Sequence, residues 1–277
     1  MTNCCAQIRR ARPLLGTFVE ISLSGADEAR LHGAADRAFR EIGRIERLMN
    51  VHAADSEVSR LNREGARADT AVSKDTWQVL RLACQVAEAT GGAFDIASPV
   101  PVRHEAPGAG YTSIALPADG RVRFTRPLRI DLGGIAKGYA VDRAVTLLEA
   151  EGLNGCVNAG GDLRGFGGCA LTVAVRDPRS PDMTGAVVSV RDFALATSAT
   201  YTAGGLSVAG RVIDPRGRAA APGARSATVR AARCALADAL AKAVLLLGDA
   251  AASALSSFGA RAFLLDASGG RPVGKVS

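Results

Sequence analysis

Aromatic residues, lysines and histidines are all scarce in this sequence of 277 residues. Phe, Trp and Tyr make up 4% of the chain, too little for the stacking surfaces that bind single-stranded nucleic acids. The net charge is +7, but the arginines are spread along the whole chain, and lysine occurs only at positions 74, 137, 242 and 275. We therefore expect no nucleic-acid partner. A modest positive field of this kind favours a small molecule that carries phosphate.

Long apolar runs and an export signal are absent as well. No run approaches the roughly 20 apolar residues that a membrane helix needs. The N-terminal stretch MTNCCAQIRRARPLLG lacks the apolar core of a signal peptide, so Cys4 and Cys5 do not form a lipid-attachment site in this sequence. The six cysteines show neither C-x-x-C nor zinc-ligand spacing. We expect a cytoplasmic protein with reduced thiols and no membrane segment.

Familiar catalytic signatures are also missing. The chain contains no G-x-S-x-G, no H-E-x-x-H, no G-x-x-x-x-G-K-[ST] and no well-formed G-x-G-x-x-G after a strand. The sequence therefore offers none of these familiar signatures as a guide to its chemistry.

Hydrophobic periodicity predicts helices over residues 27–49, 74–90, 136–151 and 234–247, and a short capped helix near 55–62. Alternation predicts a strand over 13–23 and further strands in the segments LTVAVR, AVVSVRDFALAT, LSVAGRVID, SATVRAA and ARAFLLD. The strands come in adjacent pairs with helices between the groups. This order favours an α+β fold with largely antiparallel sheets flanked by helices, as one domain over 1–277 or two closely packed lobes.

Two glycine-rich turns stand out in the second half of the chain. DLGGIAKGYAVD holds Asp131, Gly133, Gly134, Lys137 and Asp142 where a strand runs into a helix. VNAGGDLRG follows, with Asn158, Gly160, Gly161 and Asp162. Glycines allow a close backbone approach, and free N–H groups at a helix start attract an anion. Asp131 and Asp142 either bind ligand hydroxyls or fix the loop. The alternative is a plain strand-to-helix turn with Lys137 in solvent, but two such turns favour a ligand site.

The apolar helix CALADALAKAVLLLG places Asp238 and Lys242 four residues apart, on one helix face. One interpretation is a surface ion pair of little energetic value. The surrounding Ala, Leu and Val residues favour the other, a partly buried carboxylate whose partner is the lysine or a metal ion.

Taken in order, eight segments of the chain resemble the FAD:protein FMN transferases, the ApbE-like flavin transferases. They are LLGTFVEI, SEVSRLN, GGAFDI, DLGGIAKGYAVD, VNAGGDLRGFG, ALATSATY, VIDPRG and CALADALAKAVLLLG. The resemblance implies an ApbE-like, T-fold-like architecture. It also implies cleavage of FAD, transfer of its FMN part to a Thr or Ser of an acceptor protein, and release of AMP.

The resemblance assigns roles to residues of this chain. The glycine turns with Asp131, Lys137, Asp142, Asn158 and Asp162 would hold FAD, together with Thr197 and Ser198 of ALATSATY. Asp238 would bind Mg²⁺, and Asp214 of VIDPRG would belong to the catalytic site. The chain departs from the family at four positions. Lys242 replaces the usual Thr beside the metal, and Arg211 replaces the usual His. His52 replaces a common Tyr, and Ala199 of TSATY replaces a usual Gly.

Two functional hypotheses follow from these departures. In the first, the protein is a working transferase in which Lys242 serves as the resident cation and Arg211 clamps phosphate. In the second, it is a catalytically impaired FAD-binding or flavin-carrier protein of the same family.

Overall fold

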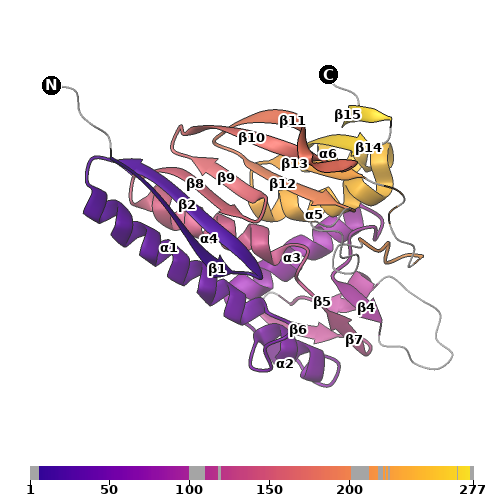
Figure 1. The fold of residues 1–277 in the computed structure, drawn as a ribbon. Coiled ribbons are helices and arrows are strands. Elements are labelled where there is room, and N and C mark those ends of the chain that lie inside the picture. Colours follow the sequence, from indigo (N-terminus) through magenta and orange to yellow (C-terminus); the bar gives the residue numbers. More distant parts are fainter. Residues whose placement is uncertain are drawn as a thin grey trace.

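An eight-stranded sheet runs through the centre of the computed structural model (Figure 1). The structure describes residues 6–99, 110–117, 120–200, 212–217, 221, 223, 225–266 and 268–274. The strand order is β1-β2-β8-β9-β12-β13-β14-β15, and all neighbouring strands are antiparallel. The strands are β1 (Ala6–Leu14), β2 (Thr17–Gly25), β8 (Asn154–Ala159), β9 (Asp162–Phe166), β12 (Ala194–Ala199), β13 (Ser226–Ala231), β14 (Arg261–Asp266) and β15 (Gly269–Val273). The predicted α+β class with antiparallel sheet is confirmed.

Three helices, α1 (Glu28–Met49), α4 (Ala136–Ala150) and α5 (Cys234–Leu247), pack side by side on the sheet. The helix α1 begins where Asp27 accepts hydrogen bonds from two N–H groups of its first turn. It buries a stripe that includes Leu31, Phe39 and Ile42. The α5 helix is apolar on nearly all sides because it packs on β12 and β13 and also contacts α4 and α3. These helices confirm the elements predicted at 27–49, 136–151 and 234–247.

The hairpin of β10 (Ala170–Asp177) and β11 (Ser180–Arg191) packs on the sheet through a smaller apolar cluster. In β12, Leu195 belongs to this cluster, whereas Ala194 and Ala196 belong to the main core. Successive side chains of a strand point to opposite faces, so the hairpin covers the face opposite the helices (Figure 1).

The remaining elements lie at the other end of the molecule or beside α5 (Figure 1). The helices are α2 (Glu57–Glu64), α3 (Lys74–Ala89) and α6 (Ala252–Ser257). The short strands are β3 (Thr70–Ala71), β4 (Ala97–Pro99), β5 (Ile114–Ala115), β6 (Arg121–Phe124) and β7 (Leu128–Ile130). Pairing of β4 with β7 places residues 93–97 beside the loop that follows β7. Among the described residues, no helix combines the length and the hydropathy that crossing a membrane requires.

Two strand predictions were wrong in their bounds. The segment 13–23 is a hairpin, because Leu15 and Gly16 both have positive φ, 58° and 69°, and turn the chain between β1 and β2. The Leu15 N–H donates to Oε1 of Glu46 at 2.9 Å, which holds this turn against α1. The segment 186–197 is likewise two strands, broken at Asp192 with φ of 54°. The predicted strand LSVAGRVID lies mostly outside the described residues.

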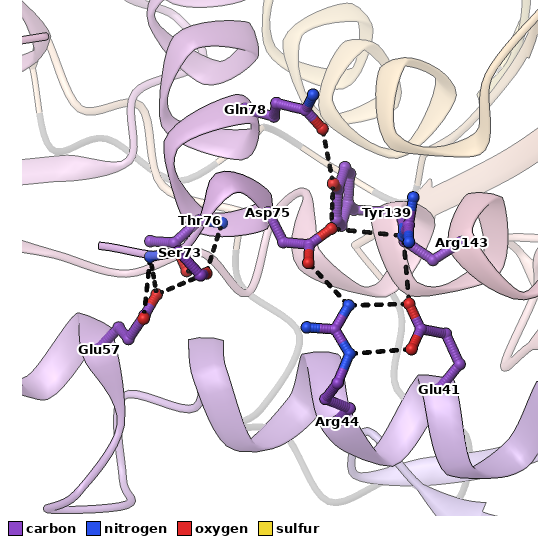
Figure 2. Close-up of polar contacts among 9 residues, drawn as sticks. All are labelled: Glu41, Arg44, Glu57, Ser73, Asp75, Thr76, Gln78, Tyr139 and Arg143. Carbon is purple, nitrogen blue, oxygen red and sulfur yellow. Dashed lines mark hydrogen bonds and ion pairs between the residues drawn. The ribbon is translucent and has the colours of Figure 1, made fainter. Parts of the chain in front are cut away.

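A polar network joins α1, α3 and α4 (Figure 2). Asp75 of α3 accepts from the Tyr139 hydroxyl and from Arg44, both at 2.7 Å, and lies 3.3 Å from Arg143. Arg44 also pairs with Glu41 at 2.8 Å. Burial opposes ionisation of Asp75, but the bonds from Tyr139 and Arg44 hold its pKa below the ordinary value. The network fixes the helix that carries Lys137.

Candidate functional site

The first glycine turn connects β7 to α4. Asp131 follows β7 directly, and its Oδ1 accepts the N–H of Gly133 at 2.8 Å. The α4 helix then begins at Ala136 without a side-chain cap. A Cβ atom on Gly138 would collide with the carbonyl oxygen of Cys234, at the start of α5. Gly138 therefore lets the backbones of α4 and α5 meet.

Lys137 lies inside a chain of alternating charges. Its Nζ is 2.8 Å from Oδ2 of Asp162 and 3.4 Å from Oδ2 of Asp238. The other oxygen of Asp238 pairs with Lys242. The side chains of Asp238 and Asp162 are 1% and 6% exposed. Because a buried carboxylate without a partner is strongly destabilising, both require the ammonium groups beside them. Lys137 is thus paired rather than free in solvent, and Asp238 is a buried carboxylate, as the apolar helix predicted.

Burial and charge act in opposite directions on this cluster. Burial alone lowers the pKa of Lys137, but the carboxylates of Asp238 and Asp162 hold it above its ordinary value. Burial, followed by the negative charge of Asp238, raises the pKa of Asp162 to about 6 despite the pull of Lys137. Lys137 therefore stays protonated at neutral pH, whereas Asp162 titrates in the mildly acidic range.

Asp142 contacts protein backbone. Its two carboxylate oxygens accept the N–H groups of Cys234 and Ala235 at 2.8 and 3.0 Å, and Arg164 approaches it at 3.2 Å. The residue is only 7% exposed, and burial raises its pKa above the ordinary value. Asp142 caps the first turn of α5, which lacks a cap of its own. Of the two roles open to it in the sequence, these contacts support the structural one.

The second glycine turn joins β8 to β9. Oδ1 of Asn158 accepts the N–H of Gly161 at 2.9 Å and closes the turn formed by Gly160 and Gly161. Asp162, at the start of β9, reaches Lys137 from there. Both glycine turns therefore meet at one lysine. This juxtaposition of segments 25 residues apart (137 to 162) comes from the packing of α4 on β8 and β9.

A cleft of about 590 Å³ lies beside the charge cluster. Its wall combines Asp131, Gly133, Gly134, Lys137, Ser198 and Lys242 from the predicted set. Phe94, Asp95, Ile96 and Leu246 line it too, with Ala199, Val212, Ile213 and Pro215. Two ammonium groups on the wall of one cleft suit an anionic ligand such as a phosphate ester.

Several predicted residues stand outside the lining of this cleft. Thr197 shares a hydrogen bond of 2.9 Å with Thr228 across β12 and β13. Asp214 sits between two residues of the lining, but its carboxylate binds Arg216 at 2.7 Å. That pairing holds the pKa of Asp214 below the ordinary value. Arg211 lies outside the described residues.

A second pocket of about 410 Å³ adjoins the first and shares Asp131, Gly133 and Lys137 with it. Its other walls are Leu15, Gly16, Glu46, Met49, Asn50, Val51, His52 and Ala136. Glu46 and Leu15 were missed from the sequence, because nothing in an amphipathic helix or an apolar hairpin sets them apart. The segment 50–52 follows the end of α1 and reaches the same loop.

Asp95 is another cleft residue that no role was predicted for. Its oxygens accept the N–H groups of Ala97 at 2.8 Å and Tyr111 at 3.0 Å. Burial raises its pKa against those bonds. The signal in the sequence was an acid within the apolar stretch GGAFDI. Asp95 holds β4 and the following described segment at the rim of the cleft.

Comparisons with known proteins agree on one family. The model of the ApbE family matches residues 15–264. The FAD:protein FMN transferase of Treponema pallidum is 28% identical, over 86% of this chain and 78% of its own. The enzyme of that name from Vibrio cholerae is 27% identical, over 88% of this chain and 82% of its own. The crystal structure of the ApbE protein from Thermotoga maritima superposes with a TM-score of 0.83, at 26% identity, covering 96% of this chain and 97% of that one.

Proposed function

Since the ApbE family model spans residues 15–264, the chain belongs to the ApbE family, and we propose that it is an FAD:protein FMN transferase. The enzyme would cleave the pyrophosphate of FAD and attach FMN through a phosphodiester to a Thr or Ser of an acceptor protein. AMP is the leaving group. The acceptor is a separate protein, and a cytoplasmic location stays a prediction of the sequence.

The observation that carries this proposal is the pair of lysines on the wall of the 590 Å³ cleft. Lys137 and Lys242 each neutralise a buried carboxylate and face the same hollow. The pyrophosphate of FAD carries two negative charges, which a site with fixed ammonium groups stabilises. Gly133 and Gly134 on the same wall leave the backbone accessible to the phosphates.

Further roles in binding FAD are assigned as part of the proposal. Asp131 lines both pockets and is exposed, so it suits ligand hydroxyls. Ser198 lines the cleft beside it. The second glycine turn holds Lys137 in place, through Asn158, Gly160, Gly161 and Asp162. Thr197 contributes by its hydrogen bond to Thr228, which ties β12 to β13. Asp214 orients its segment next to the lining, and Arg211 clamps phosphate.

Magnesium, which the resemblance associates with Asp238, does not fit the residues around that carboxylate. Lys242 pairs with one oxygen of Asp238, and the other receives Lys137 at 3.4 Å and the N–H of Gly138 at 3.3 Å. An ammonium has no lone pair to offer a metal. No cluster of three or more acidic, histidine or cysteine side chains suited to a metal ion occurs among the described residues. We therefore assign Asp238 to the ion pairs with Lys137 and Lys242.

The proposal is tested by incubating the purified protein with FAD and an acceptor protein that carries a flavinylation site. AMP is measured by chromatography, and the acceptor is assayed for covalent flavin by fluorescence after denaturing electrophoresis. Lys137→Met is expected to abolish both products, and Lys74→Met, at an exposed lysine of α3, should leave them unchanged. Tight FAD binding without AMP or labelled acceptor would contradict the transferase and support the impaired, FAD-binding alternative.

A further inference from the structure

The stem of the Lys242 side chain packs beside the loop at Gly134. A Cβ atom on Gly134 would lie 3.2 Å from Cδ of Lys242 and 3.1 Å from the ring of Phe94. The absence of that side chain leaves room for the lysine stem beside the loop. The Lys242 side chain is 24% exposed and lines the cleft. Its ammonium therefore stays at the cleft wall, even though the stem is packed.

The Lys242 ammonium also has a complete set of local partners. It pairs with Oδ1 of Asp238 and donates to the carbonyl oxygen of the same residue at 3.3 Å. Oxygen atoms arranged in this way attract a cation, and here the cation is supplied by the chain itself. Two lysines balance the two aspartates of the cluster, so a divalent ion added at Asp238 would face the repulsion of two ammonium groups.

We propose that this chain transfers FMN without a divalent metal ion, with the Lys242 ammonium as the built-in cation for the phosphate groups. The inference rests on the proposed transferase function. The bond that forms joins the acceptor oxygen to the phosphorus of the FMN part, and the bond that breaks joins that phosphorus to the bridging oxygen. The bridging electron pair leaves with AMP, and the hydroxyl proton is released to solvent. Lys242 stabilises the charge that grows on the departing phosphate.

The first experiment compares the rate of AMP release in EDTA with the rate in Mg²⁺, using the intact protein, FAD and acceptor. Equal rates are expected. Lys242→Met keeps the length of the stem and removes the charge, so the rate should fall about 100-fold or more in both conditions. Lys74→Met serves as the control for loss of an exposed lysine. Release of AMP in Mg²⁺ but not in EDTA would overturn the inference and leave the transferase intact, whereas no release in either condition would overturn the transferase itself.

A second experiment measures metal binding without relying on turnover. Mn²⁺ is titrated into the protein without FAD, and the free ion is followed by electron paramagnetic resonance. The wild type should leave Mn²⁺ free, whereas Lys242→Thr, which removes the ammonium and adds a hydroxyl oxygen, should bind it. Binding by the wild type that Asp238→Asn abolishes would overturn the inference. Failure of Lys242→Thr to bind Mn²⁺ would also count against it, because displacement by lysine would then not explain the metal-free site.

Discussion

At the scale of single residues, the candidate site is built on four side chains that alternate in charge. They run from Asp162 through Lys137 and Asp238 to Lys242. Only Asp238 and Lys242 are neighbours on one helix, and that pair was predicted from their spacing. Lys137 reaches Asp238 across 101 positions of sequence, and no local pattern announces such a contact. Burying both aspartates costs desolvation free energy, which offsets much of the attraction in the ion pairs. We therefore assign the pairs the role of holding positive charge at the cleft rather than of stabilising the fold.

Asp162 gives this cluster a pH dependence that stability measurements can detect. Its pKa in the folded protein is raised to about 6, from an ordinary value of 3.8. The folded state therefore holds the proton more tightly than the unfolded chain, and the stabilisation is present below pH 3.8 and lost as pH rises to about 6.

We expect the difference in unfolding free energy between wild type and Asp162→Asn to fall across that range, because Asn does not titrate there. Urea unfolding at several pH values, starting where both proteins are folded, gives this difference. Asp69→Asn, in an exposed pair with Arg123, is the control and should show little change. A difference that stays constant from pH 4 to pH 7 would contradict the raised pKa.

At the scale of elements, the site depends on how α4 and α5 are joined. Asp142 of α4 caps the start of α5, and Gly138 allows the close crossing between them. Asp142→Ala should lower the unfolding free energy by about 3 kcal/mol, because it removes a cap and leaves Arg164 without this carboxylate. Asp27→Ala at the exposed cap of α1 should cost about 1 kcal/mol.

Thermal and urea unfolding measure both variants, and FAD affinity is then compared under conditions where each is folded. Unchanged affinity in folded Asp142→Ala is expected. A large loss of affinity with normal stability would instead assign Asp142 to ligand hydroxyls.

The network of Figure 2 is a second tie between elements, because Asp75 links α3 to both α1 and α4. Asp75→Asn should lower the unfolding free energy by about 1–2 kcal/mol at neutral pH. The pKa of Asp75 is depressed in the fold, so this stabilisation is present above pH 3.8 and fades as pH falls through the folded-state value. Urea unfolding at neutral and acidic pH, again with Asp69→Asn as control, measures it. An Asp75→Asn variant as stable as wild type at pH 7 would contradict the role of the network.

At the scale of the whole molecule, one main core of buried apolar side chains extends from Ile8 to Val273. Strands from both ends of the described chain belong to the same sheet. We therefore expect a single cooperative unfolding transition, consistent with one domain over residues 1–277. Far-UV circular dichroism and Trp77 fluorescence should give the same midpoint in urea. Separate midpoints would indicate two lobes, with α2, α3 and the short strands unfolding apart from the central sheet.

The sequence by itself determined the features whose causes lie within a few residues. The helical repeat of apolar residues specified α1, α3, α4 and α5, and the four-residue spacing specified the Asp238–Lys242 pair. Its strand bounds failed at Leu15 and Asp192, where positive φ turns chains that alternate like continuous strands. Only the tertiary structure decided that Lys137 meets Asp162 and Asp238, and that Asp142 serves α5. Those contacts depend on the packing of α4 on β8 and β9 and against α5, because buried charges take whichever partners the completed fold brings near them.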